Sequence, residues 1–407
     1  MLSAKALSSN LGVCSVGFQL TGKGFLLSPA TAQHFRDTDI KNSDVLKPWI
    51  GGLGIQRKAE AMVAIDVCGI EEATIRQKYP AIYQHLVDSV LPERAQNARK
   101  SVRDNWWVYG EARNTFRPAI KGLKTLVVSS LTASHRTFVY VPSSAIADST
   151  TVMFAIEDAS SLAVLSSRTH VVWSLAQGGT LEDRPRYNKS RCFDPFPFPE
   201  LTETQKVLLR TLGEDLDAHR KRQQAVHPKL TLTQMYNVLE KLRAGEAIEG
   251  KDKEIYDQGL IGILRDLHDQ IDAAVADAYG WPVDLSDEEI LMRLVDLNKT
   301  RAAEEASGHI RWLRPEYQNP TGAKAEKGKT TDMDLGVVAK VEKAPWPKGL
   351  PDQIAAVREA LLEMGEASPE QIARRFARAR TTAVQPLLES LAALGQAQLT
   401  EDGRYAA

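Results

Sequence analysis

The spacing of apolar positions changes near residue 200, which predicts two regions of different construction. Before that point, short runs of β-branched and aromatic residues are typical of strands, as in Thr137–Val141 and Thr151–Ile156. Residues 82–90 instead carry apolar side chains at helical spacing. After it, apolar residues of 201–318 recur at helical spacing throughout. We therefore expect an α+β fold, with a mixed α/β domain in residues 1–200 and a helical domain in 201–318.

Two further segments follow the predicted helical domain. Residues 319–347 are rich in Lys, Gly, Thr and Pro, a composition that predicts a linker. Residues 348–407 predict three helices and a terminal hairpin, the order of a winged helix, and Ser368–Gln371 is a capping box at the start of the second helix. Near this helix lie four basic residues that either contact a DNA backbone or form a solvated face: Arg374, Arg375, Arg378 and Arg380.

Composition adds little that is specific to one function. The 407 residues carry 51 Lys and Arg against 52 Asp and Glu, a net charge of −1. A neutral total does not exclude nucleic-acid binding, because binding depends on local patches of charge. The three cysteines form no CxxC pair, and no apolar run is long enough to cross a membrane. We expect a cytoplasmic protein with reduced thiols, no metal site and no membrane partner.

Segments that resemble catalytic or cofactor motifs are incomplete. Gly51–Gly54 is the nearest approach to a glycine-rich cofactor loop, but it follows no clear buried strand, and a tight turn is the better interpretation. Asn319-Pro320 and Asp194-Pro195-Phe196 resemble parts of the Asn-Pro-Pro-aromatic motif of amino-methyltransferases, and each lacks an essential residue. We therefore expect no catalytic residue and no cofactor on this chain.

A basic and aromatic segment runs from Arg94 to Lys124. Basic side chains neutralise phosphates, and aromatic rings stack or wedge at a groove. For Trp106 and Trp107 a place in the core is the favoured interpretation, because Trp is more often buried than functional. The residues predicted to contact the DNA backbone are Arg99, Lys100, Arg103, Arg117, and His135 and Arg136 at the start of a strand.

A second polar segment, 168–191, contains two glycines followed by long polar side chains. Arg can bind guanine with two hydrogen bonds, Glu accepts from cytosine, and Asn pairs with adenine. The residues predicted to read bases are Glu182, Arg184, Arg186 and Asn188. They lie two apart, so on an extended segment they point the same way. Alternatively this is an ordinary polar loop, in which an arginine pairs with Glu182 or Asp183 and only shapes the loop.

Several stretches in this order resemble one protein family. Trp106–Gly110 resembles a Trp-Trp element of that family, and Leu181–Tyr187 resembles its Leu-Glu-x-Arg-x-Arg-Tyr segment. The remaining stretches are Pro80–Leu86, Arg168–Trp173, Cys192–Pro199, Ile310–Gln318 and Trp346–Lys348. The chain thus resembles the MmeI-like (type IIL) adenine-specific DNA methyltransferases. One departure is Gly52–Gly54, where the family often has Gly-Arg followed by an acidic residue.

The resemblance implies a target recognition domain followed by a helical C-terminal part. The family's methyltransferase domain, with its glycine loop and Asn-Pro-Pro-Tyr, is not matched. S-adenosylmethionine is therefore expected only on a separate catalytic part or partner, and double-stranded DNA and a catalytic methyltransferase subunit are the expected partners. In related enzymes, side chains at the positions of Glu182 and Arg184 read bases.

Three functions remain open from the sequence. The first is a DNA specificity module that works with a methyltransferase subunit. The second is an adenine-specific DNA methyltransferase in its own right, against which the missing motifs argue. The third is a helical interaction protein that does not bind DNA, against which the two basic segments argue.

Overall fold

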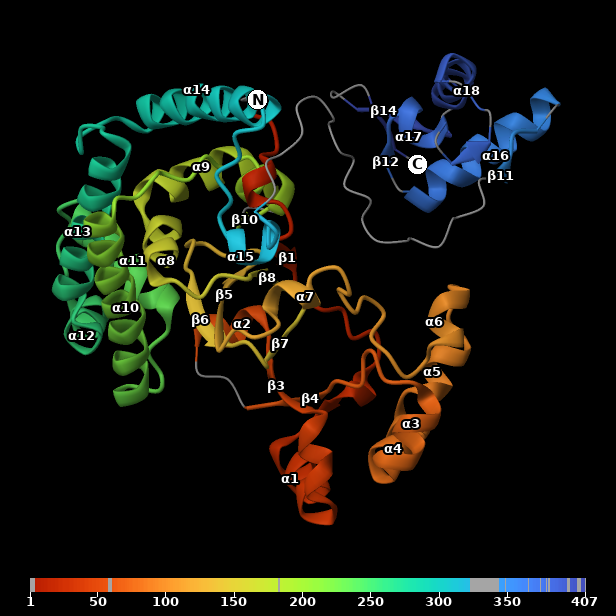
Figure 1. Ribbon diagram of the computed structural model, residues 1–407, viewed down its shortest axis with the longest axis horizontal. Coiled ribbons are helices and arrows are strands. Elements are labelled where there is room, and N and C mark those ends of the chain that lie inside the picture. Colours follow the sequence, from red (N-terminus) through yellow and green to blue (C-terminus); the bar gives the residue numbers. More distant parts are fainter. Residues whose placement is uncertain are drawn as a thin grey trace. The chain divides into compact units, whose positions relative to one another are not determined.

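The computed structural model describes residues 4–57, 61–181, 184–322, 344–347, 349–364, 366–373, 375–377, 379, 381–393, 396–400 and 404–406. The chain forms two compact units, Met1–Thr330 and Thr331–Ala407. Of the predicted linker, residues 323–343 lie outside the described part of the chain. The predicted target recognition domain and the predicted helical domain both fall in the first unit, where they share one hydrophobic core. The fold is of the mixed α+β class, as predicted (Figure 1).

A four-stranded antiparallel sheet forms the centre of the first unit. In sheet order its strands are β1 (Cys14–Val16), β8 (Thr151–Phe154), β5 (Thr125–Ser130) and β6 (Val139–Pro142). Val128 lies opposite Met153 on one side and opposite Val139 on the other. All of β8 and nearly all of β5 are buried. The apolar runs at 137–141 and 151–156 thus form strands, as their composition predicts.

A second sheet mixes antiparallel and parallel pairs. Its order is β2 (Leu26–Leu27), β4 (Val63–Ile65), β3 (Leu46–Ile50) and β7 (Ile146–Ala147). The pair β3 and β7 is parallel, with Trp49 opposite Ile146. Short helices surround this sheet: α1 (Pro29–Thr38), α2 (Gly52–Gln56), α3 (Glu72–Lys78), α4 (Pro80–Ser89), α5 (Leu91–Ala95), α6 (Lys100–Asp104) and α7 (Arg117–Ile120).

The segment after β8 leads into the helical part. It contains α8 (Ala159–Ser166), α9 (Arg168–Gly178), the short strands β9 (Thr180–Leu181) and β10 (Arg184–Pro185), and a π-helical turn, Lys189–Phe193. The helices that follow are α10 (Glu203–Val226), α11 (Leu232–Arg243), α12 (Gly250–Gly259), α13 (Ile261–Tyr279), α14 (Asp287–Ala306) and α15 (Pro315–Gln318). In Figure 1, α10–α13 (green) lie on one side of the strands and α3–α6 (orange) on the other.

Local sequence explains where the long helices begin. Thr202, Thr231 and Ser286 each cap a helix, and the Gln or Glu three residues later completes a capping box. Helix α10 then lies close against α8, because Gly213 has no side chain: a Cβ there would come within 2.2 Å of the Ala159 carbonyl oxygen. The helical part is therefore fused to the sheet region through a tight contact between helices.

The second unit has the predicted order of three helices and a hairpin. The helices are α16 (Leu350–Met364), α17 (Pro369–Ala373) and α18 (Thr381–Ala393), and the strands are β11 (Ala344–Pro345), β12 (Glu366–Ala367), β13 (Phe376–Ala377), β14 (Gln398–Leu399) and β15 (Tyr405–Ala406). Strand β15 pairs with β14 and β12, and β11 pairs with β13. Ser368 and Gln371 form the predicted reciprocal cap. Arg374, Arg378 and Arg380 lie outside the described residues, and Arg375 follows α17.

Two buried histidines make the first unit sensitive to acid. The Nε2 atom of His170 forms a hydrogen bond with the Tyr187 hydroxyl at 3.1 Å, and that of His268 forms one with the Tyr236 hydroxyl at 2.8 Å. Burial lowers the pKa of each imidazole from 6.5 to about 3, because the charged form loses its hydration. The folded protein therefore holds both rings neutral at pH values where the unfolded chain protonates them.

We expect the free energy of unfolding to fall as the pH drops below about 6.5, because the unfolded chain then binds more protons than the native chain. Asp272 opposes this trend, since burial raises its pKa to about 6 and the native carboxyl binds a proton first. One carboxyl offsets only part of the effect of two imidazoles. Urea denaturation at pH 7.5 and 5 measures the difference. A His268→Asn variant with an unchanged pH dependence would contradict the assignment.

Candidate nucleic-acid interface

The predicted base-reading segment forms a β-hairpin. Strands β9 and β10 pair antiparallel, with Arg184 opposite Leu181 and Pro185 opposite Thr180. Arg184 and Arg186 are both exposed, and Pro185 between them is half-buried. This alternation is what an extended strand produces, with residues two apart on the same face. Glu182 lies outside the described residues, so its predicted role stays a prediction.

Glycines at the base of the hairpin allow its two strands to meet. Gly179 has a φ of 83°, which other residues rarely adopt, and its carbonyl oxygen accepts from the Arg186 backbone N–H at 3.0 Å. A Cβ on Gly178 would come within 2.3 Å of the Arg186 carbonyl oxygen. Gly178 is therefore required by the close approach of the backbone, and Gly179 by its positive φ.

Asn188 has a structural task at the end of the hairpin. Its side-chain oxygen accepts from the Ser190 backbone N–H at 3.1 Å and from the Ser190 hydroxyl at 2.8 Å, which starts the π-helical turn. An Asn that caps a turn in this way holds its side chain against its own backbone. We therefore leave Asn188 out of the base contacts proposed below.

Arg117 is directed into the protein. Its guanidinium forms two 2.9 Å hydrogen bonds with the Asp66 carboxylate, a third with the Ala112 carbonyl oxygen, and lies over the Phe18 ring. The Asp66 and Arg117 side chains are only 11% and 26% exposed. A contact with a DNA phosphate would require these bonds to break, so we assign Arg117 a structural role in place of the predicted one.

His135 and Arg136 also have internal partners. The His135 ring lies 2.5 Å from the Asn237 side-chain oxygen and 3.1 Å from the Glu240 carboxylate, both on α11. Arg136 is 7% exposed and donates to the carbonyl oxygens of Ser130 and Pro185. Neither side chain is placed to reach a phosphate, because both are held against other parts of the protein.

Three of the predicted phosphate contacts lie at or next to α6. Arg99 and Lys100 are exposed, and Arg99 has one loose ion pair with Glu111 at 3.8 Å. Arg103 is half-buried and donates to the carbonyl oxygens of Asn97 and Ala98, which closes the turn before α6. Trp106 nearby is buried, as the favoured interpretation expected. Arg99 and Lys100 are thus the members of this set that solvent reaches freely.

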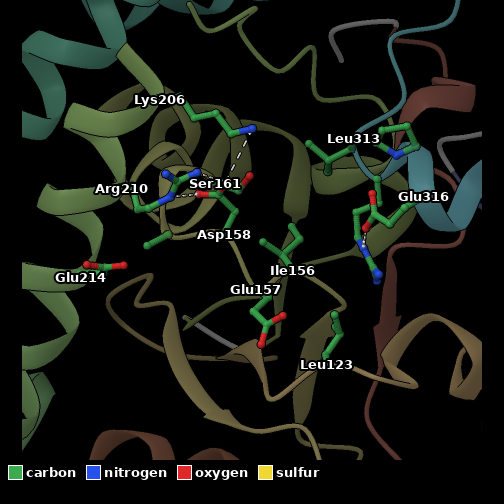
Figure 2. A pocket seen from close by; sticks show the side chains of 13 residues that line it. Leu123, Ile156, Glu157, Asp158, Ser161, Lys206, Arg210, Glu214, Leu313 and Glu316 are labelled. Atoms are coloured by element: carbon green, nitrogen blue, oxygen red, sulfur yellow. Dashed lines mark hydrogen bonds and ion pairs between the residues drawn. The ribbon is translucent and has the colours of Figure 1, made fainter. Parts of the chain in front are cut away.

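A charged cavity near the end of β8 holds paired groups. It has a volume of about 520 Å³ and lies between the end of β8, α10 and the segment leading to α15 (Figure 2). Figure 2 shows Arg210 and Lys206 of α10 directed at Asp158, to which Arg210 is bound at 2.7 Å. Asp158 also caps α8 through the Ser160 N–H. The positive charges of Lys206 and Arg210 are therefore already paired with Asp158, where the sheet meets the helices.

The Gly51–Gly54 segment differs from the sequence expectation in one respect. It does follow a strand, β3, and leads into α2, which has only five residues. The Gly52 N–H already donates to the Thr150 hydroxyl at 2.7 Å, and a Cβ on Gly52 would touch Thr150. The Gly52 N–H is therefore already paired inside the protein, and the expectation that this chain binds no S-adenosylmethionine stays a prediction. Asp194, in the other incomplete motif, is buried and paired with Lys189.

Among the described residues, no group of three His, Cys, Asp or Glu side chains is placed to hold a metal ion. Within the same part of the chain, no helix is long and apolar enough to cross a membrane.

The supporting residues of this interface were missed by sequence reasoning. Asp66 lies 51 positions before Arg117, and Asn237 lies 102 positions after His135. Their spacing carries no periodic signal, because such pairs form only when the tertiary fold brings distant segments together.

Comparison with known proteins agrees with this architecture. The sequence of residues 3–200 matches the family model described as the MmeI target recognition domain. The fold is similar to that reported in "Structure of Type IIL restriction-modification enzyme MmeI in complex with DNA", with a TM-score of 0.57 and 15% identity. That similarity covers 74% of this chain and 37% of the MmeI chain. No curated protein is similar enough to this sequence to count as a relative. The resemblance found in the sequence is thus confirmed, and residues 3–200 belong to the MmeI target recognition domain family.

Proposed function

We propose that this chain is the sequence-specific DNA-reading part of a restriction-modification enzyme. The observation that carries the proposal is the hairpin β9–β10, which presents Arg184 and Arg186 to solvent on one face. A two-stranded β-ribbon fits the major groove, and an arginine there can form two hydrogen bonds with one guanine. A glutamate carboxylate can accept a hydrogen bond from cytosine, so Glu182 is proposed as a further base contact. The family match and the MmeI–DNA structure support the same role.

Contacts with the DNA backbone are assigned to Arg99 and Lys100. These exposed cations lie at the start of α6 and have no buried partner to lose among the described residues. Each phosphate neutralised by a cation releases condensed counterions, so binding weakens as salt rises. Backbone contacts of this kind hold the protein on the duplex, whereas the hairpin supplies sequence preference.

We further propose that methyl transfer, to the N6 position of adenine, belongs to a separate catalytic part that binds S-adenosylmethionine. Support comes from the Gly52 N–H, which already donates to the Thr150 hydroxyl in the segment most like a cofactor loop, and from the 37% of the MmeI chain that the match covers. The residues of this chain then bind and orient DNA and take no part in the chemical step.

Salt dependence tests DNA binding directly. We expect the full chain to bind duplex DNA with an affinity that falls steeply between about 50 and 200 mM salt. Arg99→Ala with Lys100→Ala should reduce the slope of log affinity against log salt by about 2, since each lost phosphate contact contributes about 0.9. Fluorescence anisotropy measures both quantities.

The control is Arg265→Ala, which removes one exposed cation from α13 and should leave the slope unchanged. A flat salt dependence of the unmodified chain, or no binding at the lowest salt, would favour the alternative of a helical interaction protein.

A further inference from the structure

We infer that Arg136 is a positioning residue that determines which bases the hairpin β9–β10 reaches. The inference rests on the proposed function, because it concerns how the reading hairpin is aimed. Arg136 lies at the end of the loop between β5 and β6 and is buried. One guanidinium nitrogen donates to the Ser130 carbonyl oxygen at 2.5 Å, and the other donates to the Pro185 carbonyl oxygen at 3.1 Å. Arg136 therefore links Ser130 of the central sheet to Pro185 of the hairpin, which is the residue between Arg184 and Arg186.

The chemistry of this link favours arginine over other residues. A planar guanidinium holds two donors in fixed, diverging directions, so it can bridge two carbonyl oxygens that a lysine ammonium cannot bridge with the same geometry. The guanidinium also lies over the Tyr187 ring, with 5.2 Å between its carbon and the ring centroid. The two neighbours of Arg186 in the chain, Pro185 and Tyr187, therefore both contact the Arg136 guanidinium.

Arg136 is a buried charge that donates its side-chain hydrogen bonds to carbonyl oxygens, and burial lowers its pKa. Its Nε atom is buried without a hydrogen-bond partner. Burial of an uncompensated charge is unfavourable for folding. A role in stability alone would be served better by an apolar side chain, whereas a fixed position for the hairpin needs the two directed bonds.

Backbone hydrogen bonds extend the same link. The Ala133 N–H donates to the Pro185 carbonyl oxygen at 3.3 Å, and the Tyr187 N–H donates to the Leu131 carbonyl oxygen at 2.8 Å. Thr132 forms a β-bridge with Arg186. Residues 131–133 thus pair with residues 185–187, so the position of this loop constrains the position of the two exposed arginines.

The loop is itself held by the helical part. His135, next to Arg136, contacts Asn237 and Glu240 of α11. Helix α11 therefore holds His135, and the neighbouring Arg136 holds Pro185. Pro185 in turn lies between Arg184 and Arg186 in the chain. Sequence preference should then depend on residues of the helical domain that lie far from the hairpin in the sequence.

The experiment compares discrimination with general affinity. The unmodified chain first selects duplexes from a randomised library, and affinity is then measured for the selected duplex and for versions with one base pair changed. A changed base pair normally lowers affinity about 5- to 150-fold. For Arg136→Met we expect this ratio to fall towards 1, while affinity for unrelated duplex and its salt slope stay unchanged. Arg136→Lys should recover part of the ratio.

A second variant covers the case in which Arg136→Met does not fold. Asn237→Ala with Glu240→Ala keeps Arg136 and removes two exposed side chains that hold the loop, and it should shrink the ratio in the same direction. Its matched control is Glu254→Ala with Gln258→Ala, an exposed hydrogen-bonded pair on α12. The control should leave the ratio unchanged.

Three results overturn the inference. Full discrimination in both the Arg136 and the α11 variants would show that the link does not aim the hairpin. An equal loss of affinity for selected and unrelated duplexes would assign Arg136 to folding alone. If the unmodified chain selects no sequence, the proposed function fails first, and the inference fails with it.

Discussion

Replacing both Arg184 and Arg186 by alanine is expected to lower the affinity for the chain's own recognition sequence by about 2–6 kcal/mol. Each well-placed pair of hydrogen bonds between an arginine and a guanine contributes about 1–3 kcal/mol of discrimination against the wrong base. Both side chains are exposed and lie on one face of the hairpin, so both can enter one groove. Equilibrium binding to the selected duplex and to an unrelated duplex measures the loss.

The affinity for unrelated duplex should change much less, because removing two base-reading side chains leaves Arg99 and Lys100 on the backbone. Arg191→Ala serves as the control, since it removes an exposed arginine just after the hairpin. An equal loss on both duplexes would contradict base reading and would favour the alternative that these arginines only shape the loop.

The second large effect concerns the stability of the first unit. Asp66→Ala should lower the free energy of unfolding by about 3 kcal/mol, because it leaves the Arg117 guanidinium largely buried without its anion. Burial and the loss of hydration lower the pKa of Arg117, and hydrogen bonds to Asp66 more than restore it, so the net shift is upward. Chemical denaturation at neutral pH measures the change.

The matched control is Asp257→Ala, which removes an exposed ion pair with Lys253 on α12 and should cost about 0.5 kcal/mol. DNA affinity per folded molecule and its salt slope should be unchanged in Arg117→Met. A normal stability in Asp66→Ala, together with a smaller salt slope in Arg117→Met, would return Arg117 to the set of phosphate contacts.

Local pattern was a good guide to individual elements. The apolar runs at 137–141 and 151–156 contain β6 and β8, and the helical spacing at 82–90 falls largely in α4. Helix starts at Ser286 and Ser368 follow from capping side chains. These features depend on neighbours within a few positions, which is the range over which periodicity and capping act.

Pairing between distant segments was not predictable in the same way. The sheet of β2, β4, β3 and β7 consists of strands of two to five residues, too short to show alternation, and Trp49 pairs with Ile146 about a hundred positions away. Strand β3 contains Pro48, and its place before Gly51 was not expected. The helical pattern that begins near residue 200 also did not predict that residues 1–200 and 201–318 share one core. Helical spacing identifies an apolar face but does not show what that face packs against.

The same distinction explains the candidate site. Arg184 and Arg186 are exposed with the half-buried Pro185 between them, which fits the alternation expected of an extended segment, and their base-reading role stays a prediction. No local feature of the sequence separates Arg99, which is exposed, from Arg117 and Arg136, which are held inside. An arginine next to aromatic residues has the same local pattern in both cases, and only the tertiary partner decides between solvent, carboxylate and carbonyl oxygen.

The central claim is that this chain reads a specific DNA sequence through its hairpin. Its most direct test is selection from a randomised duplex library by the unmodified chain, reconstituted with a catalytic part where one is at hand, and by Glu182→Ala and Arg184→Ala. We expect the unmodified chain to enrich one defined sequence, and each variant to relax the preference at one base pair of it. No enriched sequence, or an identical enriched sequence in both variants, would contradict the claim.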